Sequence, residues 1–349
     1  MKSIKEKNKV SLIIPCYNGA AFLPQCFQCI LNQSYHNIEL IIVNDGSTDA
    51  SEQIIQQHQR AVTERGYEFI YVKKENGGAA SAVNDGLNCV TGQYLMLYDV
   101  DDILMRDAVK AKADFLDQHP EYGLARSNVY YVRSKNPGQN SYLFVTKRNE
   151  KRREHIFEDL VLGRTNNWTG TYMIRTELFF KCIRGRSIYV SPWGQNLQIL
   201  LPVAYLYRAG FIDRPLMRYV DHGNSVSKTQ DPQRELKLFC GFEENRIEII
   251  RRMEMPEEEK ERYIAQIRGL YLHIKLQSVC CHGNQEQMRH YHAQLKERGL
   301  LKMTDRLCYW LSRTTVTRKL YHSAGFCLKM ARCMYLKAEG KVLRHDPLY

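Results

Sequence analysis

The first third of the chain alternates short apolar runs with segments of helical periodicity, and this alternation constrains the fold most. Apolar, β-rich runs occupy residues 10–15, 38–44, 67–73 and 93–99. A segment with helical spacing of apolar residues lies between each consecutive pair of runs. Single helices between strands predict a parallel sheet with right-handed crossovers. The runs are apolar on both faces, which is typical of strands covered by helices on both sides.

The rest of the chain predicts further elements and then a change of pattern. We expect a helix over 106–118 and a strand over 122–134. The polar, basic stretch 134–166 predicts a surface excursion, a mobile loop beside the site, and 196–210 predicts a buried helix stopped by Gly210. Beyond Pro232 the pattern is nearly all helical. The predicted fold class is therefore α/β, an open, mostly parallel sheet with helices on both faces, followed by an all-helical extension. The predicted domains are 1–230 and 231–349, and the predicted helices of the extension are 234–252, 256–281, 284–298 and 304–337.

Charge and apolar content limit the partners and the location. The net charge is +12, and from residue 300 onward ten Lys and Arg face three Asp and Glu. An anionic partner is therefore expected, but the absence of any aromatic-basic RNA motif disfavours nucleic acid. No hydrophobic region of the signal-peptide type follows MKSIKEKNK, and the longest apolar run, near 197–207, is interrupted by Gln198 and Pro202. We expect a cytoplasmic protein, without signal peptide or membrane span.

Eleven cysteines occur without the spacing of a disulfide framework. Cys26 and Cys29 form a CxxC, but they lie in a helical pattern with no second pair and no neighbouring His. We interpret them as buried apolar residues rather than as zinc ligands or a redox pair.

Polar segments follow all four predicted strands, and the first three contain glycine. They are Pro15–Gly19, Asn44–Asp49, Glu75–Gly78 and Asp99–Asp102. In an open parallel sheet, ligands bind in the crevice outside the carboxyl ends of the strands. Four such segments at one edge predict a ligand site there.

The acidic segment after the fourth strand, in LMLYDVDDIL, indicates a cation. Asp99, Asp101 and Asp102 would repel one another and raise their pKa values unless a cation lay among them. An Asp-x-Asp motif suits Mg²⁺ or Mn²⁺, which keep open positions for phosphate oxygens. The alternative is that the cluster only caps the helix beginning near Met105, with Asp102 as N-cap.

The other segments fit a nucleotide. Asn76, Gly77 and Gly78 open a helix whose N-terminus can receive phosphate. Tyr17 could stack on a base and Asp45 could accept a hydrogen bond from one, although loop packing and helix capping explain both residues equally well. Neither GxGxxG nor GxxxxGK[ST] is present, which disfavours a dinucleotide-binding domain and a P-loop.

The segments VSLIIPCYNGAAFLPQCFQCILNQ, IELIIVNDGSTDAS, NGGAASAVNDGL and YLMLYDVDD resemble, in order and spacing, the family 2 glycosyltransferases of GT-A fold. The resemblance is close over residues 10–105 and looser to about 227. It implies a nucleotide-diphosphate sugar donor, usually UDP-linked, a divalent metal ion and transfer with inversion. This family usually has a basic residue just before the Asn of its SAxN segment, and the chain has Val83 at that position. The implied metal ligands are Asp99, Asp101 and Asp102, and the predicted substrate-binding residues are Pro15, Tyr17, Asn18, Asp45, Asn76, Gly77, Asp99, Trp193 and His222.

A departure from the family pattern occurs where Glu-Asp usually precedes an acceptor-side helix. The chain has Gln195-Asn196 there, and an amide cannot take a proton from a sugar hydroxyl. Asn196 could orient the acceptor while another group acts as base, or positioning and leaving-group stabilisation could suffice. The third interpretation is a sugar-nucleotide-binding protein with little or no turnover. The predicted catalytic residues are Asn196, Gln195 and Asp101, and the candidate bases are Asp159, Asp213, Asp221 and His222.

The C-terminal segment 315–338 has a basic amphipathic pattern. Such a helix binds at a membrane surface or packs on its own protein with a solvated charged face, and the pattern leaves both open. The expected reaction is transfer of a sugar to a saccharide or lipid-linked glycan in surface polysaccharide biosynthesis, with peripheral association at the inner membrane face through 315–338.

Overall fold

We analysed a computed structural model, which describes residues 6–133, 141–145, 148–183, 185–222, 229, 231–320 and 342–343. The chain divides into two compact units, Met1–Val220 and Asp221–Tyr349. The predicted domain boundary at residue 230 therefore falls inside the second unit. Over the described residues, no helix combines the length and the apolar character that crossing a bilayer requires.

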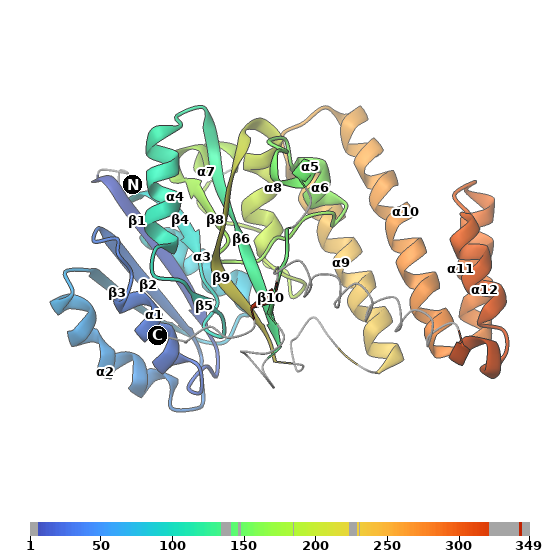
Figure 1. The fold of residues 1–349 in the computed structure, drawn as a ribbon, viewed down its shortest axis with the longest axis horizontal. Coiled ribbons are helices and arrows are strands. Elements are labelled where there is room, and N and C mark those ends of the chain that lie inside the picture. The colour runs from blue at the N-terminus through green and yellow to red at the C-terminus, as the bar shows by residue number, and fades with distance from the viewer. Residues whose placement is uncertain are drawn as a thin grey trace. The chain divides into compact units, whose positions relative to one another are not determined.

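The first unit is built on a mixed sheet whose parallel half comes from the start of the chain (Figure 1). Strands lie in the order β7-β6-β8-β4-β1-β2-β3. The parallel half consists of β3 (Glu68–Lys74), β2 (Ile38–Asp45), β1 (Glu6–Cys16) and β4 (Gly92–Leu97). Their register pairs Ile13 with Ile41 and with Leu97, so these strands end together at one edge.

The other half of the sheet is antiparallel. β4 pairs with β8 (Tyr172–Arg175), β8 with β6 (Tyr122–Arg133), and β6 with β7 (Ser141–Leu143). A short strand, β5 (Ile103–Leu104), pairs with the long β9 (Arg208–Asp221). The predicted α/β class is confirmed, and the parallel order of the first four strands passes into an antiparallel half at β4.

Alternation along β1 sends side chains to two helical layers. Leu12 and Ile14 belong to the core covered by α1 (Leu23–Leu31), α2 (Ser51–Glu64) and α4 (Ala108–Gln118). Ile13 points to the opposite face, where Gly86 allows α3 (Ala79–Cys89) to approach it closely. Cys26 and Cys29 lie on α1, the first fully buried and the second partly buried.

Two parts of the first unit differ from the sequence prediction. The helix predicted over 196–210 ends earlier: α8 spans Asn196–Leu206 and β9 begins at Arg208. Gly210 lies inside β9, where a Cβ atom would collide with the ring of Phe115, so close packing explains it. The predicted excursion 134–166 contains α5 (Arg148–Lys151) and the buried α6 (Phe157–Val161), and α7 (Thr176–Cys182) follows β8.

The second unit is helical, as predicted. It contains α9 (Pro232–Arg252), α10 (Glu257–His282), α11 (Gln285–Glu297) and α12 (Met303–Leu311), a helical segment over 315–320 and the two-residue β10 (Val342–Leu343). Capping residues set these boundaries: Asp231 accepts a hydrogen bond from the amide of Gln233, and Asn284 accepts one from the amide of Gln287. Gly283 ends α10 with a positive φ of 74°.

Candidate nucleotide-sugar site

The segments after β1 and β2 are joined by hydrogen bonds. The amide of Asn18 donates to Ser47 Oγ at 3.0 Å, and the amide of Thr48 donates to Asn18 Oδ1 at 2.8 Å. Asn18 adopts a left-handed backbone conformation, with φ of 50°, which Asn tolerates better than most residues. Tyr17 beside it is 53% exposed, whereas Pro15 is partly buried and Cys16, the last residue of β1, is buried. The loop therefore presents a free aromatic face at the sheet edge.

Asp45, at the end of β2, organises the segment after β3. Its carboxylate accepts hydrogen bonds from the amides of Gly77 and Gly78, at 2.9 and 2.8 Å, and from Lys74 Nζ at 2.8 Å. Asp45 is only 3% exposed, whereas Asn76 and Gly77 are exposed. The internal carboxylate thus occupies the position at the start of α3 that we predicted for phosphate. Asp45 holds the loop in shape, and base recognition by its carboxylate stays a prediction.

Removing this carboxylate tests its ordering role. Asp45→Ala should leave two amides and one ammonium group without their acceptor, which costs about 2 kcal/mol or more. We expect a lower thermal midpoint and weaker UDP binding, measured by calorimetry. Glu52→Ala is the matched control, because Glu52 forms a largely exposed ion pair with Lys73 and its loss should cost less than about 1 kcal/mol. Equal effects of the two variants would contradict the assignment.

The acidic turn after β4 lies against the first loop. Gly19 sits so near Val100 that a Cβ atom there would lie 3.4 Å from Val100 Cγ2. Asp99 accepts a hydrogen bond from Thr169 Oγ1 at 2.5 Å, and Asp102 accepts one from the amide of Val220 at 3.0 Å. The four polar segments therefore form one continuous edge, extended by Thr169 and by the end of β9.

Charge in this turn is high and solvation is low. Burial, together with nearby Asp101, raises the pKa of Asp99 to about 6, although the bond from Thr169 lowers it. Burial and the two neighbouring carboxylates also raise the pKa of Asp102. A cation placed here would favour the ionised forms of all three groups.

The turn fits a divalent ion with fewer protein ligands than we predicted. The described residues include no group of three His, Cys, Asp or Glu side chains gathered for a metal. Asp102 is 3% exposed and bonded to β9, so Asp99 and the partly exposed Asp101 are the two carboxylates that could hold an ion. This donor set fits Mg²⁺ or Mn²⁺, since such ions commonly take one or two carboxylates and complete their coordination with phosphate and water.

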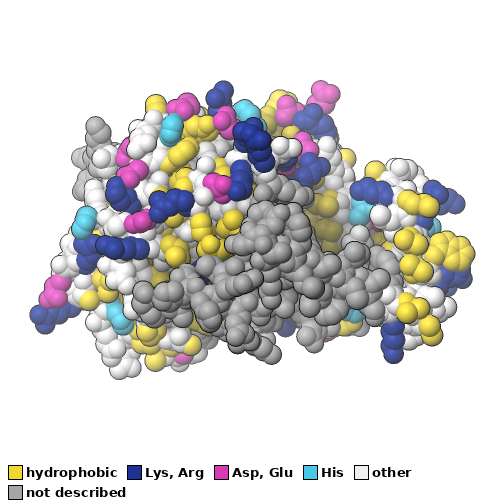
Figure 2. Space-filling view, viewed as in Figure 1, with side chains coloured by type: hydrophobic (Ala, Val, Ile, Leu, Met, Phe, Trp, Pro, Cys, Tyr) yellow, Lys and Arg dark blue, Asp and Glu magenta, His cyan; other side chains and the backbone are white. Residues whose placement is uncertain are grey.

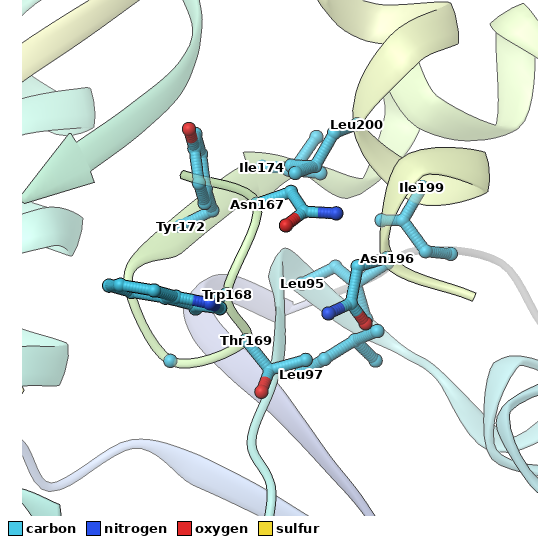
Figure 3. A pocket seen from close by; sticks show the side chains of 11 residues that line it. Leu95, Leu97, Asn167, Trp168, Thr169, Tyr172, Ile174, Asn196, Ile199 and Leu200 are labelled. Atoms are coloured by element: carbon cyan, nitrogen blue, oxygen red, sulfur yellow. The ribbon is translucent and has the colours of Figure 1, made fainter. Parts of the chain in front are cut away.

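A small cavity lies between the segment before β8 and the start of α8 (Figure 3). Asn196, at the start of α8, lines it together with Thr169 and Asn167. The Asn196 Oδ1 atom is buried and has no hydrogen-bond partner. Thr169 touches both sides of the site, because it lines the cavity and bonds Asp99. The remaining lining residues are Leu95, Leu97, Trp168, Gly170, Tyr172, Ile174, Ile199 and Leu200.

The segment 166–171 was missed as a functional loop in our sequence analysis. It precedes β8, and β8 runs antiparallel to β4, so the start of β8 lies at the same edge as the end of β4. A search limited to the residues that follow each strand therefore overlooks this segment, because it precedes β8. The signal available in the sequence was NNWTGT, in which Gly170 needs a positive φ of 76° and packs on Met217. Trp168 stacks on Tyr219 with ring centroids 4.3 Å apart, which fixes the loop.

Two of the four candidate bases are held in ion pairs. Asp159 is buried and both its oxygens accept from Arg153. Asp213 accepts from Lys151 Nζ at 2.5 Å and from Asn128 Nδ2 at 3.2 Å. These pairings indicate structural roles.

The other predicted residues on the acceptor side are less tightly defined. Asp221 and His222 begin the second unit, beside residues outside the described set, and their roles stay predictions. Gln195 is the N-cap residue of α8 and is 9% exposed, and Trp193 is partly buried. Neither of these two lines the cavity. Val83 is fully buried in α3, so it makes no contact with a phosphate at the edge.

The fold and the edge define a GT-A-type domain. Residues 11–179 match the family model described as "Glycosyl transferase family 2". This segment is therefore similar to the family 2 glycosyltransferases, in agreement with the resemblance that the motifs showed.

Two curated relatives are similar to about a third of the chain. Glycosyltransferase GlyA of Streptococcus pneumoniae is 39% identical over 103 residues, which are 30% of this chain and 14% of GlyA. The minor teichoic acid biosynthesis protein GgaB of Bacillus subtilis is 36% identical over 111 residues, 31% of this chain and 12% of GgaB. The chain thus spans less than a fifth of either relative.

Solved structures share the fold over most of the chain. TarS residues 1–349 of S. aureus, in complex with UDP-GlcNAc, superpose with a TM-score of 0.55 and 15% identity, covering 87% of this chain and 90% of that one. The mannosyltransferase PcManGT of Pyrobaculum calidifontis, in complex with GDP-Man and Mn²⁺, gives a TM-score of 0.53 and 16% identity, covering 97% and 87%.

Proposed function

We propose that the chain transfers a sugar from a UDP-linked donor to a saccharide or lipid-linked glycan in surface polysaccharide biosynthesis. One observation carries this proposal: the loops after β1, β2 and β3, the acidic turn and the Asn196 cavity form one continuous edge. The family match, the UDP-GlcNAc bound by TarS and the teichoic acid role of GgaB support it.

The residues divide into a donor side and an acceptor side. Tyr17, Asn18 and Asn76 line the exposed part of the edge and would hold the nucleoside. Asp99 and Asp101 would hold Mg²⁺ or Mn²⁺ with the diphosphate, and the Mn²⁺ complex of PcManGT supports such an ion. When bound, this ion offsets the charge that builds on the leaving UDP. His222 is proposed as a further donor contact.

The cavity is proposed to receive the acceptor hydroxyl. Asn196 would orient this hydroxyl with its amide, and Thr169 would keep Asp99 in place while the hydroxyl attacks opposite the diphosphate, so that the anomeric centre inverts. Asn196 cannot remove the proton, because an amide is not a base. The hydroxyl proton would therefore pass to water as the new C–O bond forms and the bond to UDP breaks, and the reaction would depend mainly on positioning and on leaving-group stabilisation.

A carboxylate at position 196 should restore a base. Asn196→Asp is expected to raise turnover with an acceptor present by about tenfold or more, since a positioned base contributes about 10²-fold or more. Asn167→Asp is the matched control, because Asn167 lines the same cavity but does not begin α8. We expect no gain from the control. Loss of transfer in Asn196→Asp would show instead that the amide itself is required.

A panel of nucleotide sugars with Mn²⁺ tests the proposed function directly. A donor that raises the thermal midpoint and releases UDP supports transfer. The second candidate function is sugar-nucleotide binding without turnover, favoured by Gln195-Asn196 and by the ion pairs of Asp159 and Asp213. Binding with no UDP release from any donor, with or without added glycan acceptors, would select that candidate. Absence of all nucleotide-sugar binding would refute both.

A further inference from the structure

Helix α12 in the second unit exposes an apolar face. Met303, Leu307 and Trp310 are 80%, 54% and 63% exposed. Their spacing of four and three residues places them on one side of the helix. The opposite side packs inward, with Cys308 and Asp305 buried. Three large apolar side chains on one short helix are therefore left in water by the packing of α10, α11 and α12.

Exposed cations lie beside this face, and the described residues 300–320 contain no exposed acidic side chain. Lys302, Arg306 and Arg313 are exposed, and the guanidinium of Arg313 lies 4.9 Å from the ring centroid of Trp310. Asp305 is the one acidic residue between 300 and 320, and it is 1% exposed and accepts a hydrogen bond from the amide of Lys302. Figure 2 shows hydrophobic and basic side chains side by side over this end of the second unit. We name Lys302, Met303, Arg306, Leu307, Trp310 and Arg313 the α12 patch.

We propose that the α12 patch docks on an anionic lipid membrane. Apolar side chains bordered by Lys and Arg, with Trp at the level of the headgroups, match the chemistry of such a surface. A second copy fits poorly, because a symmetric contact between two patches would bring cations against cations. This inference does not rest on the proposed function, and it places the contact on described residues before the amphipathic segment 315–338, whose part from 321 onward lies outside them.

Vesicle binding by the full chain tests the proposal. The chain is mixed with vesicles of phosphatidylcholine alone or with one-quarter phosphatidylglycerol, and bound protein is separated by flotation. We expect binding to the anionic vesicles only, weakening as salt rises. Quenching of Trp310 fluorescence by brominated lipid should accompany binding. In Trp310→Phe, this quenching should disappear while binding persists.

Surface variants test whether vesicle binding depends on the α12 patch or on another part of the chain. Arg306→Glu with Arg313→Glu, and Leu307→Ser with Trp310→Ser, should each weaken partitioning at least about tenfold. The matched controls are Lys237→Glu on α9 and Leu206→Ser at the end of α8, both at exposed positions, which should bind as the unchanged chain does. Because all six positions are exposed, thermal midpoints should stay within a few degrees.

Three outcomes would overturn the proposal. Equal binding to neutral and anionic vesicles would remove the role of the cations. Unchanged binding of both double variants would place the contact elsewhere. Self-association in light scattering that the double variants abolish, with no vesicle binding by the unchanged chain, would make the patch a contact between copies.

Discussion

Replacing Asp101 by Ala is expected to lower sugar transfer at least about a hundredfold with Mn²⁺ in excess. Under the proposed function Asp99 and Asp101 hold the metal ion, because Asp102 is buried and bonded to the amide of Val220. Loss of one of two ligands should leave the charge on the leaving diphosphate poorly compensated. UDP affinity measured by calorimetry with Mn²⁺ should fall in parallel, and this second measurement does not depend on an acceptor.

The control for this variant is Asp114→Ala, which removes a carboxylate paired with Lys110 on the surface of α4. Transfer and UDP affinity should remain within about twofold of the unchanged chain. If Asp101→Ala binds UDP as tightly as this control in excess Mn²⁺, the assignment of the acidic turn is wrong.

Lys112→Met is expected to stabilise the protein strongly and in a pH-dependent way. Lys112 is fully buried on α4, its ammonium donates to the carbonyl of Ala108, and burial lowers its pKa to about 7. The unfolded chain has an ordinary Lys pKa of about 10.4 and binds a proton that the folded chain lacks between pH 7 and 10. Stability of the unchanged chain therefore rises with pH in this window, and Met, of similar length, removes the penalty.

The expected gain is on the order of 3 kcal/mol at pH 6 and should shrink steadily from pH 7 toward pH 10. Thermal unfolding followed by circular dichroism at pH 6, 8 and 9.5 measures it. Lys110→Met on the same helix is the control, because Lys110 is half-exposed and paired with Asp114. Its effect should be under about 1 kcal/mol and nearly flat with pH. A flat or destabilising effect of Lys112→Met would show that the ammonium is well solvated in the folded state.

The parallel half of the sheet could be predicted from sequence because its signals are local. The apolar runs predicted the positions of β1 to β4 to within a few residues. The polar segments that follow these strands meet at one edge because parallel strands end together. Tyr17, Asn18 and Asn76 are exposed there, and Asp99 and Asp101 follow β4 as expected.

The remaining parts of the site depend on pairings distant in sequence. Residues 208–210, which begin β9, were predicted as the end of a buried helix, because the pairing of β9 with β5 is not visible in the sequence. The cavity likewise needs residues 166–171 beside Leu97 and Asn196. The internal role of Asp45 was also hidden, because no local pattern shows that Gly77 and Gly78 turn their amides toward it. Antiparallel placement of β8 and loop-to-loop hydrogen bonding are tertiary properties, which short-range periodicity does not encode.

The change of strand direction at β4 has a consequence for how such a chain can diverge. The loops on the donor side come from the first hundred residues, whereas the cavity wall comes from a loop before β8 and from α8. Under the proposed function, substitutions in 166–171 or along α8 can therefore alter acceptor choice and leave the nucleotide loops intact. Thr169 is the exception, because it lines the cavity and its hydroxyl also bonds Asp99. A substitution at this position that changes acceptor choice should therefore also weaken donor binding.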